Sequence, residues 1–255
     1  MKKVSLWSIL MLVVLTLPLL AACGGDGDDD SGLTVTPSSI SMHYEDTQQL
    51  SAQGATSYKS NDEFVAKVDQ AGLVTGGHVG TTQIIASNGK KTGICEVTIT
   101  PEYDLYDTPI LDWGVSASTI SSKETHKLES STDDYLIFNY QKGNTACAMS
   151  YAFENGKLKS VIAILNYSSY VSAGYYLLER YQPIGEDEGI FVFLDALTKD
   201  KAKTAVAFST ATISGSKVTS IIYMPATSTS SSMRSVQSNN LPTGIISDII
   251  KDKDF

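Results

Sequence analysis

Apolar and polar residues alternate in short runs over much of the chain, and glycine or asparagine separates many of these runs. Alternation with a period of two is typical of strands that bury one face. In the first third of the chain, the runs lie at 33–35, 40–42, 49–52, 66–68, 82–86 and 94–100. Asn88-Gly89 falls between the last two runs, and this dipeptide favours a tight hairpin turn. Residues 33–101 are therefore predicted to form an all-β sandwich.

The same segment carries a more specific pattern of residues. It begins with Val35-Thr36-Pro37, and residues 65–86 keep a regular spacing of glycines and apolar residues. The pattern resembles the group 2 bacterial immunoglobulin-like domain. Two positions depart from it: Glu45 stands where the family usually has Gly, and Tyr58 where it usually has Trp. Members of the family occur in adhesins and other cell-surface proteins, so the resemblance implies a stalk or spacer, although such a sandwich hosts many functions.

Residues 103–227 show a second pattern, in which helical and strand-like periods alternate. A helix is predicted near residues 121–128, where Ser121 and Glu124 have the spacing of a capping box. A second helix is predicted from Ser168 or Ser169, with an apolar stripe at four positions and support from Leu177. Those four positions are Val171, Tyr175, Leu178 and Tyr181. Strands are predicted at 135–140, 146–153 and 158–165, and again at 190–194, 204–210 and 218–224.

The order of one helix and three strands thus occurs twice in residues 103–227. Asn155-Gly156 predicts a hairpin in the first copy, and aligning the copies places Gly156 over Gly215. The expected class is α+β, an antiparallel sheet backed by helices. This element order resembles the tandem repeats of β-lactamase-inhibitor-like proteins of envelope lipoproteins. In that architecture the exposed concave sheet face usually contacts another protein. The alternative is a structural domain that binds no partner.

The N-terminus has the features of an export signal. Two lysines precede a mostly apolar run at residues 6–20, which is too short for a spanning helix of about 20 residues. The sequence Leu20-Ala21-Ala22-Cys23 follows. It resembles the lipobox of bacterial lipoproteins, which implies cleavage of residues 1–22 and attachment of lipid to Cys23. Acyl chains on that residue would anchor the protein in a membrane. The alternative is an ordinary cleaved signal followed by an incidental cysteine.

Residues 23–32 are flexible and acidic in composition, and they predict a tether after the anchor. Their carboxylates are Asp26, Asp28, Asp29 and Asp30. Such a run resembles the signal that sends some lipoproteins to the outer face of the outer membrane; a plain tether and a periplasm-facing protein are the alternatives. The spacing also imitates the start of a calcium-binding loop, but Pro37 stands where position 12 requires Glu.

The overall charge and the available side chains limit the chemistry that the chain is expected to perform. A net charge of -9 argues against nucleic-acid partners. The three histidines, His43, His78 and His126, lack metal-ligand spacing, and His78 is expected in a solvated loop. We therefore expect no enzyme, cofactor or metal. A hydrolase with paired carboxylates remains an alternative, because carboxylates that meet only in the folded structure cannot be recognised in the sequence. Residues 186–188 are acidic and are predicted to form a solvated loop.

Tyrosine is abundant, with 13 residues, and several lie around the second predicted helix. Tyr175 and Tyr181 share its apolar stripe, whereas Tyr167 and Tyr176 are the candidates for exposed aromatic side chains that bind a ligand. Packing of these tyrosines beneath the sheet is the favoured alternative. The favoured function is binding of a protein or glycan by a surface lipoprotein. The second interpretation is a purely structural envelope component. The sequence does not indicate an oligomeric state.

Two features complete the sequence predictions. Cys95 and Cys147 share strand faces with apolar residues and are expected to be buried and unpaired. Residues 228–255 form a tail that is flexible by composition. A short docking helix is possible within it, because four isoleucines have helical spacing: Ile245, Ile246, Ile249 and Ile250.

Overall fold

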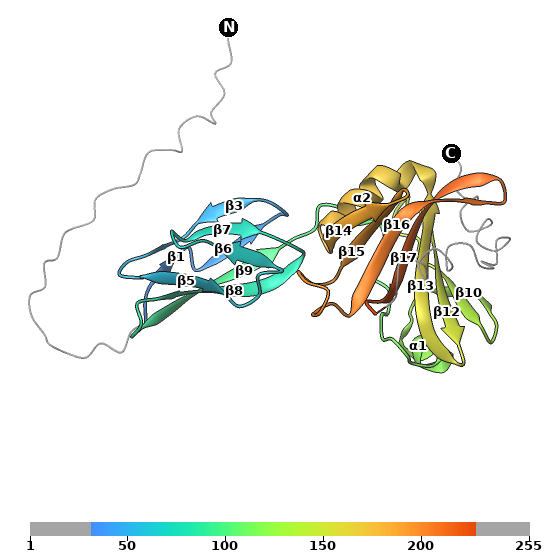
Figure 1. Cartoon of the computed structure of the whole chain (residues 1–255), viewed down its shortest axis with the longest axis horizontal. Helices are drawn as coiled ribbons and strands as arrows, with labels where there is room; N and C mark the ends of the chain where they lie inside the picture. The colour runs from blue at the N-terminus through green and yellow to red at the C-terminus, as the bar shows by residue number, and fades with distance from the viewer. Residues whose placement is uncertain (1–31, 228–255) are drawn as a thin grey trace, which may run out of the picture. The chain divides into compact units, whose positions relative to one another are not determined.

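The computed structural model describes residues 32–227 (Figure 1). The predicted signal peptide, Cys23, the aspartate run and the C-terminal tail lie outside the described residues. No helix within residues 32–227 has the length and apolar character needed to cross a membrane.

The first domain is a β-sandwich, which confirms the predicted all-β segment. One sheet has the order β2-β9-β8-β5, a second has β3-β7-β6, and β1 pairs with β4. The strands are β1 Val35–Thr36, β2 Ser39–Met42, β3 Thr47–Gln49, β4 Ser51–Ala52, β5 Ser57–Ser60, β6 Ala66–Val68, β7 Leu73–Gly76, β8 Gly80–Ser87 and β9 Thr92–Ile99. Alternate residues of β8 and β9 are buried between the sheets, as a period of two requires.

Of the two residues that depart from the family pattern, Glu45 lies in a turn and Tyr58 lies in β5. Glu45 has a φ of 65°, in the left-handed region that glycine adopts more easily. Tyr58 packs against Gly72, where an added Cβ would come within 2.9 Å of the tyrosine Cζ atom. The β8–β9 turn contains Gly89 with a φ of 84°, and the Asn88 side chain accepts hydrogen bonds from two backbone N–H groups of the turn.

The second domain contains one sheet of eight antiparallel strands, in the order β10-β11-β12-β13-β17-β16-β15-β14 (Figure 1). Its first half comprises α1 Ala117–Lys123, β10 Lys127–Ser131, β11 Tyr135–Asn139, β12 Cys147–Glu154 and β13 Lys157–Asn166. Its second half comprises η1 Tyr167–Ser169, α2 Tyr170–Leu178, β14 Gln182–Asp187, β15 Ile190–Leu194, β16 Thr204–Ile213 and β17 Ser216–Pro225. The halves join where β13 pairs with β17.

Four strands follow each helix, so the prediction of three strands per copy is wrong. The missing strands, β10 and β14, lie at the two edges of the sheet. Both consist largely of exposed residues, and neither shows a buried apolar alternation. Because edge strands need not bury a face, they lack the pattern by which strands are recognised in sequence.

Tight hairpins connect strands at corresponding places in the two halves. Asn155 and Gly156 have φ values of 52° and 71°, and Ser214 and Gly215 have values of 49° and 81°. A two-residue turn with both φ angles positive matches the twist of the strands it joins. The hairpin predicted at Asn155-Gly156 is therefore confirmed, and Gly215 occupies the equivalent turn position.

Both helices differ in detail from their predicted positions. Helix α1 begins at Ala117, because the side chain of Ser116 caps it by accepting from the Thr119 N–H group. The predicted capping box at Ser121 is therefore wrong, since Ser121 lies inside the helix. In α2 the buried residues are Ala173, Tyr176 and Leu177. The predicted apolar stripe is also wrong, because it includes exposed residues of α2.

The helices and the lead-in segment 103–115 pack on one face of the eight-stranded sheet. Cys147 lies in that core, and Cys95 lies in the core of the first domain. Both cysteines are free and fully buried, which confirms their prediction. Burial raises the pKa of each thiol, so both remain protonated hydrophobic side chains rather than reactive thiolates.

Candidate functional site

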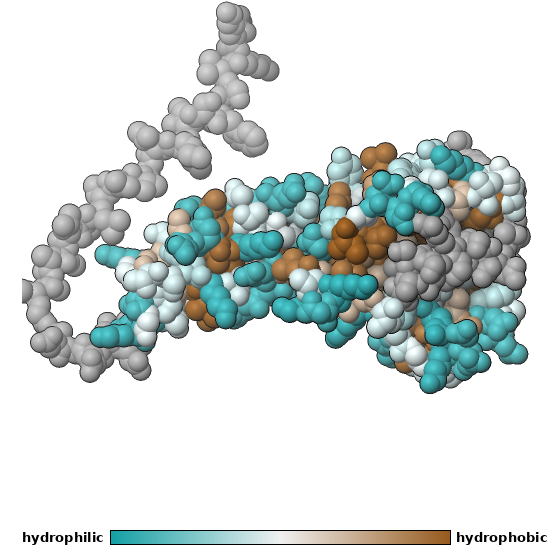
Figure 2. All heavy atoms as spheres, viewed as in Figure 1, coloured by the Kyte–Doolittle hydropathy of each residue, from teal (hydrophilic) through white to brown (hydrophobic). Residues whose placement is uncertain are grey.

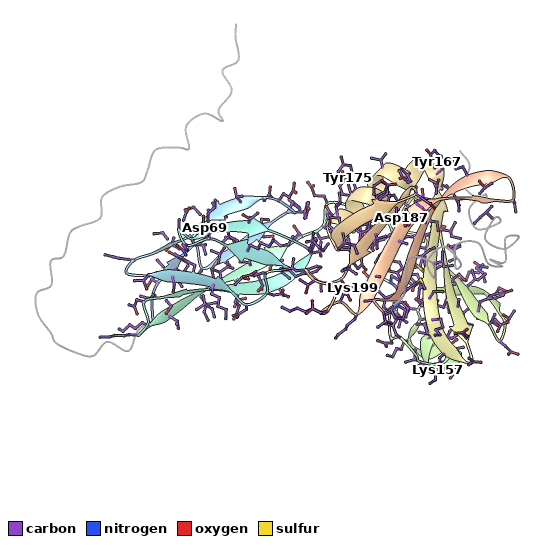
Figure 3. All side chains as sticks on the ribbon, viewed as in Figure 1. Asp69, Lys157, Tyr167, Tyr175, Asp187 and Lys199 are labelled. Atoms are coloured by element: carbon purple, nitrogen blue, oxygen red, sulfur yellow. The ribbon has the colours of Figure 1, made fainter. Side chains whose placement is uncertain are left out.

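A row of exposed side chains runs along η1 and α2 in the second domain. Tyr167, Val171 and Tyr175 are 45%, 67% and 49% exposed. They recur every four residues, which places them on one side of the helical segment. Figure 3 labels Tyr167 and Tyr175 on the outer side of this segment, away from the sheet. We call these three residues the aromatic stripe.

Neighbouring side chains hold the two tyrosines of the stripe in place. The Tyr175 ring stacks on Tyr103, with centroids 5.1 Å apart and planes 14° from parallel. The Lys217 ammonium lies 4.2 Å from the centroid of the Tyr167 ring, within the range of a cation–π contact. Both rings are thus exposed yet fixed by partners, so a ligand could contact them with little loss of side-chain freedom.

More apolar surface lies on the strands next to this helix. Ile184 of β14 and Phe191 of β15 are 53% and 41% exposed. The Phe191 ring lies 6.1 Å from Phe208, and Phe208 stacks at 4.7 Å on Tyr170 of α2. Figure 2 shows hydrophobic residues gathered over β14 and β15. The aromatic contacts therefore connect the exposed part of β15 with the helix that carries the stripe.

The sequence identified one tyrosine of this surface correctly and one wrongly. Tyr167 is exposed, as predicted, but Tyr176 is only 1% exposed. The Tyr176 hydroxyl donates to the Tyr106 carbonyl oxygen at 3.4 Å, and Arg180 lies over its ring. Tyr175, which was expected in the core, is exposed instead. The buried residues of α2 are Ala173, Tyr176 and Leu177. The helix is therefore rotated about its axis relative to the prediction.

A second group of side chains with notable chemistry surrounds Glu124, just after α1. The Glu124 side chain is only 3% exposed. One carboxylate oxygen accepts from the hydroxyls of Tyr140 and Tyr151, the latter at 3.0 Å. The other lies 2.6 Å from His126 Nδ1 and accepts from the backbone N–H groups of residues 125 and 126. His126 also stacks on Tyr140 and lies 3.4 Å from Asp107. We call this group the Glu124 network.

The electrostatics of the Glu124 network favour a charged carboxylate. Burial raises the pKa of Glu124, but hydrogen bonds from Tyr140, His126 and Tyr151 outweigh it, so its pKa lies below the ordinary 4.5. Burial is the main cause that raises the pKa values of Tyr140 and Tyr151, so both stay protonated donors. Both carboxylate oxygens are occupied by donors, which indicates a structural role for this group.

The remaining sequence candidates for chemistry are scattered. Residues 186–188 are exposed, and Glu186 accepts from the Gly189 N–H group of its own turn at 2.7 Å. His78 is only 3% exposed, so the expectation of a solvated loop residue is wrong. Its ring packs 4.1 Å from the Phe64 ring centroid, and burial lowers its pKa below 6.5. Within residues 32–227, no group of three or more His, Cys, Asp or Glu residues could hold a metal ion.

Comparison with known proteins bears on the first domain. No curated protein matches the chain. A solved structure, that of domains 5-6 of the S-layer protein SbsC, is 14% identical to the chain. The match covers 78% of this chain and 86% of that one, with a TM-score of 0.23, and a likeness this weak carries no argument about function. Residues 31–99 match the family described as bacterial Ig-like domain (group 2), so this segment is such a domain, of a kind often found in surface or cell-envelope proteins.

Proposed function

We propose that this chain is a lipid-anchored protein of the outer membrane, displayed toward the cell exterior, which binds a protein ligand. In this proposal residues 31–99 act as a stalk, and the second domain carries the binding surface. The observation on which the proposal rests is the aromatic stripe on η1 and α2, with Val171 at 67% exposure between two exposed tyrosines.

The chemistry of the stripe supports a protein ligand. Tyrosine is enriched in protein interfaces, where a rigid ring gives contact area and its hydroxyl gives a polar contact. Exposed apolar residues that gather on one surface mark interaction sites, whereas scattered ones do not. Val171 has no hydrogen-bonding group, so the centre of the stripe favours an apolar partner surface over the hydroxyl-rich surface of a glycan. A glycan ligand is therefore the less favoured form of the same proposal.

The anchor in this proposal comes from the N-terminal sequence. Leu20-Ala21-Ala22-Cys23 supports lipid attachment at Cys23, and the following aspartates support export to the outer face. A periplasm-facing protein is the alternative. The occurrence of group 2 Ig-like domains in envelope and surface proteins is consistent with either orientation.

Two other functions remain as competitors. A purely structural envelope component would not need an apolar row fixed by stacking partners. A hydrolase would need a pair of carboxylates with free oxygens, whereas the oxygens of Glu124 all accept hydrogen bonds inside the protein. We accordingly propose a binding protein without enzymatic activity, cofactor or nucleic-acid partner.

The test is site-specific photocross-linking on intact cells that display the full-length protein. A benzophenone amino acid replaces Val171 in one variant and Lys199 or Lys157 in control variants, because both lysines are exposed and lie outside the stripe (Figure 3). We expect a discrete cross-linked protein band from position 171 that is absent from the control positions. The band should weaken at least tenfold when Tyr167 and Tyr175 are both changed to Ala. The same bands from all positions, or no band from position 171, would overturn the proposal.

A further inference from the structure

The aromatic stripe is symmetrical about its centre. Tyr167 and Tyr175 lie four residues before and four residues after Val171, and both tyrosines are close to half exposed. Reversing the direction of the helical segment therefore exchanges the two tyrosines and leaves the valine in place. A surface with this property can pack against a copy of itself that runs in the opposite direction, because a two-fold interface uses the same residues on both sides.

The helical segment that carries the stripe contains no charged side chain. Residues 167–178 include no Asp, Glu, Lys or Arg. This composition matters because each copy of the chain has a formal net charge of -9, so two copies repel each other on the whole. The uncharged segment is a surface on which two copies can approach without placing like charges opposite each other.

The charged residues beside the two ends of the stripe have opposite signs. Lys217 is exposed, and its ammonium lies 4.2 Å from the centroid of the Tyr167 ring. At the other end, the exposed Glu102 directly precedes Tyr103, whose ring stacks on Tyr175. In an antiparallel pair the first end of one copy meets the second end of the other, so Lys217 approaches Glu102. The charges are therefore complementary in the antiparallel orientation, whereas a parallel pair would bring like charges together.

Small side chains beside the stripe leave room for a second helix. Ser168 and Ser172 each follow a residue of the stripe, and together they form the next row of side chains on the helical surface. Rows of residues spaced four apart pack between the rows of a partner helix, with the two axes crossing at about 50°. Because serine side chains are short, two copies of the segment can interdigitate with their Val171 side chains near the two-fold axis.

The area of the stripe indicates a weak contact. A tyrosine has about 150–250 Å² of surface to bury, so the two half-exposed tyrosines together offer roughly 200 Å² per copy. Stable interfaces bury about 800 Å² per partner, so the stripe by itself supports only a transient pair. Molecules held on one membrane by the proposed lipid anchor meet at a high effective concentration, which favours such a pair.

We propose that the protein ligand of the aromatic stripe is a second copy of this chain, which packs antiparallel to the first with Val171 near the two-fold axis. This inference rests on the proposed function, because it names the partner of the same surface. Tyr167 of each copy contacts Tyr175 of the other. Binding is therefore homophilic, and it joins molecules that carry the same chain.

Disulfide linking of introduced cysteines tests the pair in the full-length mature chain with Cys23 changed to Ser. Native Cys95 and Cys147 are fully buried, so the introduced thiol is the one available group. Helices packed about 8–10 Å apart bring facing Cα atoms to within about 7 Å, the limit for a disulfide. Val171→Cys should form linked dimers under mild oxidation at least tenfold faster than Lys199→Cys, an exposed position outside the stripe (Figure 3). Equal rates at the two positions would overturn the proposal.

A mixture of two variants tests the direction of the pair. Tyr167→Cys and Tyr175→Cys place thiols that meet across an antiparallel interface. Each of these thiols lies about 12 Å along the helix from the same thiol of the other copy, because each helical residue rises about 1.5 Å. The mixture should therefore form linked dimers at least fivefold faster than either variant alone. Linking that is as fast in the single variants would indicate another arrangement and overturn the proposal.

The photocross-link from position 171 on intact cells distinguishes this inference from the proposed function. A band with the mass of two copies of the chain supports both. A discrete band of any other mass retains the proposed function but overturns the second copy as the ligand. No band from position 171 overturns both.

Discussion

Replacing Glu124 by Gln should strongly destabilise the second domain while leaving its shape nearly unchanged. The substitution keeps the size of the side chain but replaces one acceptor oxygen by an NH2 group. The carboxylate receives both tyrosine hydroxyls on one oxygen, and His126 and two backbone N–H groups on the other. The amide can satisfy one of these sets but not both, because its nitrogen donates rather than accepts.

The expected loss follows from the number of hydrogen bonds involved. A hydrogen bond to a charged group contributes about 1.5–3 kcal/mol. Two such bonds lose their acceptor in Glu124→Gln, but one tyrosine hydroxyl can then donate to the other, because the Tyr140 and Tyr151 hydroxyl oxygens lie 2.7 Å apart. A neutral amide is also easier to bury than a carboxylate. Together these effects predict a loss of about 2–4 kcal/mol in the free energy of unfolding.

Urea unfolding, monitored by tryptophan fluorescence, measures this loss of stability in the second domain. The chain has two tryptophans, and Trp7 lies in the predicted signal peptide. The mature protein is therefore expected to keep only Trp113, whose indole N–H group lies 3.3 Å from Thr204 Oγ1. Glu129→Gln is the control, because Glu129 pairs with the exposed Lys127 and should contribute less than about 1 kcal/mol.

The pH dependence gives the sharper test of the reasoning. The pKa of Glu124 is lowered by folding, so its contribution to stability is complete above the ordinary value of 4.5 and is lost as pH falls through the folded value. The stability difference between the native protein and Glu124→Gln should therefore shrink below about pH 4.5. A difference that stays constant from pH 7 to pH 3, or a loss no larger than that of Glu129→Gln, would refute the structural role of the charge.

Three further predictions concern the first domain and the N-terminus. Glu45→Gly should raise the unfolding free energy of the first domain by about 0.5–1 kcal/mol, because the φ of 65° at Glu45 strains a residue that has a Cβ. Calorimetry measures this change, and Glu63→Gly is the control, which should not stabilise the domain. Cys23→Ala should abolish lipidation and release the protein from the membrane fraction, unless the anchor lies elsewhere. Changing Asp28, Asp29 and Asp30 to Ala should reduce protease access on intact cells; unchanged access would favour a plain tether.

The parts of the fold that were predicted correctly are those that local sequence determines. The sandwich follows from alternating residues in strands such as β8 and β9, whose apolar faces are buried. The turn at Asn155-Gly156 follows from two residues that tolerate positive φ angles. Glu45 was recognised as a departure from a usual glycine, and the structure shows the left-handed backbone that makes glycine usual there.

The parts that were missed depend on contacts between distant residues. Helix α2 buries Ala173, Tyr176 and Leu177 in the core that it shares with the sheet, whereas local periodicity placed Tyr175 inside and Tyr176 outside. The Glu124 network joins residues from Asp107, which contacts His126, to Tyr151, which donates to Glu124, and no spacing in the sequence signals that they meet. The edge strands lack an apolar face altogether. Each of these features is fixed by tertiary structure rather than by local pattern.

The joint between β13 and β17 has a consequence for how the second domain is assembled. These two strands are the last of their halves, and they form the central pair of the sheet. When synthesis or export has delivered residues up to Asn166, β13 has hydrogen-bonding groups along one side that await residues 218–223. A chain cut between the halves would leave β13 open to any other strand. Two molecules could also complete each other by exchanging halves, so the short segment between β13 and α2 is where intertwined dimers would originate.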